Sequence, residues 1–88
     1  MADLEEQIFM VHHMAQYTKS PVQAEFWHAL EEGIRAGKYG DRWQDKGWGN
    51  IPENEPDKMR RAKGIGFRMG KRIGGGENID PRETAATL

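Results

Sequence analysis

The 88-residue chain contains no cysteine, so neither a disulfide nor a thiolate metal site can hold it together. No apolar run approaches the roughly 20 residues of a membrane-spanning helix. Only 36% of the residues are hydrophobic and 31% are charged, which predicts a thin core or a core shared with a partner. The stretch MADLEEQIF begins with acidic residues, unlike a signal peptide. We therefore expect a small cytoplasmic domain that does not associate with membranes.

Patterns that would indicate catalysis are also missing. His12 and His13 are adjacent, so on a helix their side chains point about 100° apart, and His28 is distant in the sequence. The chain has no H-E-x-x-H pattern, and its GGGEN stretch lacks the Lys-Ser/Thr of a phosphate loop. We therefore predict a protein that is not an enzyme and has no cofactor and no metal site.

Helical signals dominate what is present. Ser20 before Pro21 is a typical helix start, and apolar residues then recur every four positions from Val22 to Ile34. Similar patterns predict an all-α domain over residues 1–76, with three helices at about 4–17, 21–38 and 57–73, and a flexible tail over 77–88. The residues expected in the core are Phe9, Phe26, Leu30 and Met69.

The segment DRWQDKGWGNIPENEP, between the second and third expected helices, has neither a helical nor a strand period. We interpret it as a structured linker. Its tryptophans, Trp43 and Trp48, are predicted either to dock on the helices or to stack on a base or fill a partner's pocket.

Charge is distributed unevenly along the chain. Residues 1–57 hold eleven acidic and five basic residues, whereas residues 58–76 hold seven basic residues and no acidic one. Such a block is typical of a phosphate-binding surface. The alternatives are an acidic protein partner and a solvated helix face that pairs with the chain's own carboxylates.

A glycine pattern occurs twice, as GIRAGKYG over residues 33–40 and as GFRMGKRIG over residues 66–74. Glycine costs a helix roughly 1 kcal/mol relative to alanine, so its repeated use requires a reason. A stripe of small residues allows a close approach, either to another helix or to a sugar–phosphate backbone. Both interpretations remain open at the level of the sequence.

The pattern Ala29-x3-Gly33-x2-Ala36-Gly37-x2-Gly40 resembles the first helix of the ribosome modulation factor family. The residues Asn50-Ile51-Pro52 and the later Ala62-x3-Gly66-Phe67-x2-Gly70 resemble that family's connector and second element. The resemblance covers about residues 26–72. It implies a small helical fold that binds ribosomal RNA of the small subunit and promotes inactive ribosome dimers.

The stretch KGIGFRMGKRI is also similar to the hairpin of helix-hairpin-helix DNA-binding proteins. That resemblance implies a turn at Gly64, Ile65 and Gly66, whose backbone N–H groups hold a phosphate of duplex DNA.

The primary hypothesis is a small regulatory protein that binds ribosomal RNA or the ribosome. Its alternatives are a helix-hairpin-helix DNA-binding protein and a protein–protein inhibitor, adaptor or virion component with an acidic protein partner. The residues predicted to bind nucleic acid are Arg35, Lys38, Lys58, Arg60, Arg61, Lys63, Gly64, Gly66, Arg68, Lys71 and Arg72. Those predicted to stack on a base or bind a partner are Trp43, Trp48 and Phe67.

Overall fold

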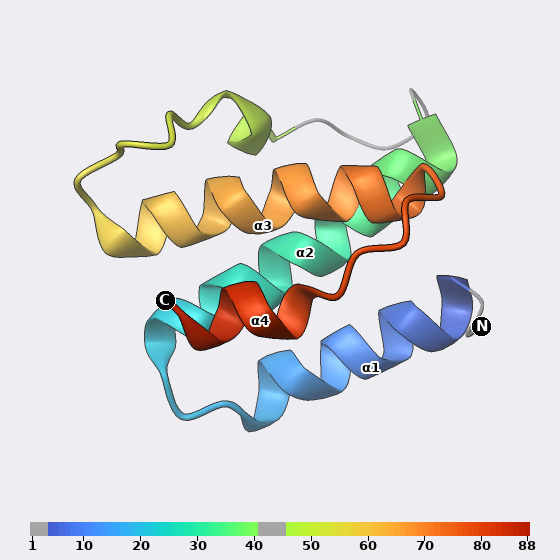
Figure 1. Cartoon of the computed structure of the whole chain (residues 1–88), viewed down its shortest axis with the longest axis horizontal. Coiled ribbons are helices and arrows are strands. Elements are labelled where there is room, and N and C mark those ends of the chain that lie inside the picture. Colours follow the sequence, from blue (N-terminus) through green and yellow to red (C-terminus); the bar gives the residue numbers. More distant parts are fainter. Residues whose placement is uncertain (1–3, 41–45) are drawn as a thin grey trace.

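A computed structural model describes residues 4–40 and 46–88, and these residues form helices and loops without a strand. The expected all-α fold with three principal helices is confirmed (Figure 1). The elements are α1 (Leu4–Tyr17), α2 (Pro21–Tyr39), the short 3-10 helix η2 (Trp48–Asn50), α3 (Lys58–Gly74) and the short α4 (Pro81–Ala86).

Side-chain caps determine where the two central helices begin. The Ser20 hydroxyl accepts a hydrogen bond from the backbone N–H of Gln23 at 3.2 Å, and Pro21 occupies the first helical position. The Asp57 carboxylate accepts from the N–H groups of Met59 and Arg60 at 2.9 and 3.3 Å. These caps satisfy N–H groups that have no partner within the helix.

The helices α2 and α3 lie side by side and run in the same direction. Their contacts advance in step, because Gly66 lies against Phe26, and Gly70, one turn later, lies against Leu30. Parallel helices need a return path as long as the helix, about 25 Å for the 17 residues of α3. The chain between α2 and α3, here called the connector, is described over residues 46–57. This part runs back along α3 (Figure 1), which explains the length of the tryptophan-containing linker.

The repeated glycines lie at the α2–α3 interface. A Cβ atom added to Gly33 would overlap the carbonyl oxygen of Phe67 and lie 2.9 Å from the Cα of Gly70. A Cβ on Gly37 would lie 3.1 Å from the Cα of Gly74. Because carbon atoms pack at about 3.5–4.0 Å, only glycine allows the two backbones to approach this closely. The two copies of the pattern thus pack against each other.

Larger side chains fill the core on the other side of α2. Phe26 and Leu30 are fully buried, as predicted, and Met69 is partly buried against the same cluster. The prediction for Phe9 is wrong, because its side chain is 74% exposed. The inward positions of α1 are taken by Ile8 and Val11, which are buried against α2.

The expected flexible tail is also wrong. The Asp80 carboxylate accepts a hydrogen bond from the backbone N–H of Arg82 at 3.0 Å and caps α4, whose first residue is Pro81. Pro81 and Ala85 are buried, and α4 packs on α2. The sequence DPRE combines an N-cap, a proline at the first position and an acid in the first turn. The helix that follows is only six residues long, too short to show a helical period in the sequence.

Candidate nucleic-acid interface

The predicted site residues on α3 divide between two sides of the helix. Gly66 faces α2, where an added Cβ would overlap the Phe26 carbonyl oxygen. Gly64 lies under the side chain of Ile51, with the built Cβ 2.8 Å from the Ile51 Cβ. Both glycines are buried. Contrary to the prediction, neither presents its backbone to a phosphate.

The helix-hairpin-helix turn is not formed. Residues 64–66 lie in the middle of α3, which is continuous from Lys58 to Gly74. Their N–H groups therefore point along the helix axis in the ordinary i to i−4 pattern and are not gathered at a helix N-terminus. The physical reason is that both glycines serve packing contacts of a long helix, which a hairpin would break.

Two of the predicted phosphate-binding arginines hold the connector. Arg61 donates from Nη1 to the carbonyl of Glu55 at 3.0 Å. Arg68 donates from Nη1 to the carbonyl of Gly49 at 3.4 Å and to that of Ile51 at 2.5 Å. Both side chains are half-buried. The backbone carbonyls of this loop have no partners in a regular helix or sheet, and the two arginines supply hydrogen-bond donors to them. The sequence pattern alone did not indicate this structural role of the arginines.

Four other cations of α3 are exposed. Arg60 pairs with Glu55 at 2.6 Å and Arg72 with Glu77 at 2.7 Å, and the two arginine side chains are 57% and 62% exposed. The Arg72–Glu77 pair has both side chains at least half exposed, and such a pair contributes about 0–1 kcal/mol, so a phosphate can replace its carboxylate at low cost. The Glu55 side chain is only 13% exposed, so its pair with Arg60 is more firmly held. Lys58 and Lys71 are exposed and form no ion pair with any described residue.

These four residues lie at the two ends of α3, and all four are exposed. Lys71 and Arg72 are in the last turn, where the negative end of the helix dipole favours a cation. Lys58 and Arg60 are in the first turn, which carries no acidic residue, and there the dipole disfavours a cation. Helix stability therefore accounts for the C-terminal pair of cations, and the ion pair with Glu55 accounts for Arg60, but neither accounts for Lys58.

A groove of about 470 Å³ lies beside Arg72. It is bounded by Arg68 and Glu53, and its apolar lining comes from Ile65 and Met69. The groove thus combines an exposed guanidinium with half-buried apolar side chains.

The aromatic candidates are less available than predicted. Phe67 is 2% exposed, so it cannot stack on a base. Trp48 is half-buried, and its ring packs edge-on against the Phe67 ring, with 6.0 Å between the two ring centroids. The ammonium groups of Lys46 and Lys63 lie 4.9 and 5.0 Å from the centre of the Trp48 ring, a cation–π arrangement. Trp43 lies outside the described residues.

Three further cations are engaged elsewhere. Lys63 is 3.5 Å from a carboxylate oxygen of Glu25 on α2. Arg35 and Lys38 face α1: Arg35 lines a cavity with residues of α1, and Lys38 pairs with Glu5. The hydrogen bond that Lys38 donates to the Glu5 carboxylate raises the pKa of Lys38 above its usual value. Neither residue joins the exposed cations of α3.

Metal clusters and membrane-spanning helices can be sought only in the part of the chain that the structure covers. No group of three or more His, Asp or Glu side chains among residues 4–40 and 46–88 is arranged to hold a metal ion. Within the same ranges, no helix combines the length and apolarity required to cross a bilayer.

Comparisons with protein-family models, curated proteins and solved structures find no match for this chain. The function is therefore argued from the residues themselves.

Proposed function

We propose that this protein is a small non-enzymatic binding protein that contacts RNA phosphates through the exposed cations of α3. The observation that carries the proposal is Lys58, an exposed lysine with no ion pair among the described residues, placed in the first turn of a helix where the dipole disfavours it. Residues that oppose local stability are expected at functional sites. Lys71 and Arg72 add positive charge about 20 Å along the helix from Lys58.

The groove beside Arg72 favours single-stranded RNA over duplex DNA. Its apolar lining of Ile65 and Met69 suits the face of an unpaired base, while Arg72 is placed to hold the adjoining phosphate. A duplex keeps its bases stacked and has nothing to insert. The ribosomal RNA suggested by the resemblance to ribosome modulation factors offers such unpaired segments, so the ribosome is the proposed target.

Salt dependence tests the proposal. Contacts with four phosphates predict that affinity falls by about two decades between 50 and 200 mM salt, because each neutralised phosphate releases condensed counterions. Binding to ribosomes, single-stranded RNA and duplex DNA is measured at both concentrations. An absence of binding to all three at 50 mM salt would contradict the proposal, and a preference for duplex DNA would contradict the role of the groove.

The double variant Lys58→Ala/Lys71→Ala locates the interface. Neither lysine forms an ion pair within the described residues, so the fold should be preserved and the salt slope should decrease by about two. The matched control is Lys19→Ala, since Lys19 is an exposed lysine outside α3. If the control lowers the slope as much as the double variant, binding does not involve α3.

A protein-binding function is the second candidate, favoured by exposed aromatic residues on α1. Phe9 is 74% and Tyr17 71% exposed, and the His13 ring lies 4.4 Å from that of Tyr17. Aromatic side chains dominate binding energy at protein interfaces. A photo-crosslinker placed at His13 should capture one specific protein in cells and lose it in the Phe9→Ala variant. Crosslinks that persist in that variant would exclude this face.

A further inference from the structure

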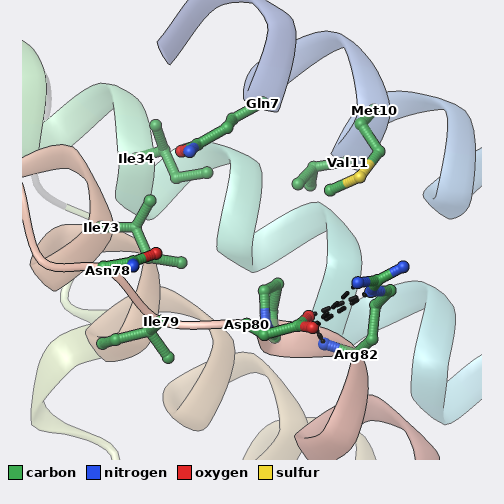
Figure 2. Close-up of a pocket in the computed structure, with 10 residues that line it drawn as sticks. Gln7, Met10, Val11, Ile34, Ile73, Asn78, Ile79, Asp80 and Arg82 are labelled. Carbon is green, nitrogen blue, oxygen red and sulfur yellow. Dashed lines mark hydrogen bonds and ion pairs between the residues drawn. The ribbon is translucent and has the colours of Figure 1, made fainter. Parts of the chain in front are cut away.

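A further cavity, of about 310 Å³, lies where α1 and α2 meet the segment before α4. Its walls come from all four α-helices and from the segment before α4 (Figure 2). The volume is at the lower end of the range for small-molecule sites. The C-terminal segment that the sequence suggested was flexible forms one wall. The side chains that matter for the argument are Gln7, Val11, Ile34, Ile73, Asp80 and Arg82.

Most of the cavity wall is apolar, and its charges are neutralised. Val11, Ile34 and Ile73 are buried core residues that also border the cavity. At the opposite side, Arg82 donates to both carboxylate oxygens of Asp80, with distances of 3.0 to 3.3 Å (Figure 2). The wall therefore carries no net charge from this pair and favours a neutral occupant.

One polar atom of the wall lacks a partner. Oε1 of Gln7 is buried and accepts no hydrogen bond from any described residue. Figure 2 shows the Gln7 side chain reaching from α1 toward Ile34, with its amide at the cavity. A buried acceptor without a donor is unfavourable, and most buried side-chain polar atoms have a partner. A ligand that brings an N–H or O–H group would satisfy it.

We propose that this cavity binds a small, neutral, largely apolar molecule that donates one hydrogen bond to Oε1 of Gln7. The apolar walls formed by Val11, Ile34 and Ile73 cover the apolar part of this molecule, and Gln7 fixes its orientation. This site is independent of the RNA-binding surface on α3, so either one can exist without the other.

Indole and benzofuran are the probes, because they share shape and size but only indole carries an N–H donor. Titrations of the full chain are followed through the isoleucine methyl signals. Indole should give saturable shifts at Ile34 and Ile73, with Ile51 of the connector unaffected. Benzofuran should shift the same signals but bind roughly three- to tenfold more weakly, the equivalent of one net hydrogen bond.

The variant Gln7→Leu removes the acceptor while keeping a side chain of similar size. We expect it to bind the two probes equally, at about the affinity of the original protein for benzofuran. Gln16→Leu is the matched control, because Gln16 is also on α1, is exposed and does not line the cavity. This control should retain the preference for indole.

The comparison of the two probes uses the unaltered protein, so it does not depend on how a variant folds. Any of the following results would overturn the proposal: no saturable shift with either probe, equal affinities for both in the unaltered protein, or shifts centred on Ile51. A preference for benzofuran would also overturn it, because the buried atom would then not act as an acceptor.

Discussion

Helix α2 packs against α3 and against α1 through two different kinds of contact. Against α3, it presents Gly33 and Gly37, and the backbones of the two helices touch. Against α1, it presents large side chains, with Val11 buried among them and cavities on both sides of α1. A backbone contact tolerates no added atom, whereas a contact between side chains can adjust or leave space. The α2–α3 pair is therefore the rigid unit, and α1 is the part with room for a ligand.

The largest expected effect tests the backbone contact. Gly33→Leu should destabilise the protein by about 3 kcal/mol, the upper end of the range for overpacking, because the obstacle is the backbone of α3. For a domain of this size, thermal denaturation should show a decrease in Tm of roughly 12–24 °C. Gly75→Leu is the control, since Gly75 is exposed and has a φ of −82°. Equal Tm values for the two variants would show that the helices are not in backbone contact.

A smaller effect is expected at the α1–α2 contact. Val11→Ala removes two methyl groups from a fully buried side chain and should lower the free energy of unfolding by about 1.5 kcal/mol. Phe9→Ala, two residues away on the same helix but largely exposed, should change it by less than about 0.5 kcal/mol. Urea denaturation measures both. A larger loss for Phe9→Ala than for Val11→Ala would mean that α1 is rotated relative to the arrangement described.

The cap of α3 contributes less again. Asp57→Ala leaves the N–H groups of Met59 and Arg60 without their acceptor and should cost about 1 kcal/mol. Asp57→Asn should retain nearly all of the stability, because asparagine caps about as well as aspartate. The same denaturation measurement separates the two variants. If neither changes stability, packing against α2 alone determines where α3 begins.

The smallest effect concerns α4 and pH. Hydrogen bonds from the side chain and the backbone N–H of Arg82 lower the pKa of Asp80 below its usual value. A lowered pKa in the folded state means that the contribution is complete above the unfolded value of about 3.9 and is lost as the pH falls through the folded value. The Arg82 amide signal in NMR should therefore move only below about pH 4. In the Asp80→Asn variant this movement should be absent, and a persisting one would assign it to another group.

The candidate interface was only partly predictable from sequence. The seven cations of α3 stand out in the sequence, but the pattern could not separate the roles of its members. Arg68 donates to carbonyls of residues that precede it by 17 and 19 positions, and Lys63 approaches Glu25 on another helix. These partners depend on how the connector returns along α3 and on how α2 packs against α3. A local sequence pattern does not predict either arrangement.

Local chemistry in the sequence determined the positions of the helices and the need for close packing. Ser20, Pro21 and Asp57 act within one turn of their own position, and glycines at four-residue steps define a small face wherever the helix lies. Only the tertiary structure decided what met that face. Either a parallel helix or a nucleic acid could cover the glycines. Which of the two covers them depends on contacts between residues about 40 positions apart, such as Phe26 with Gly66.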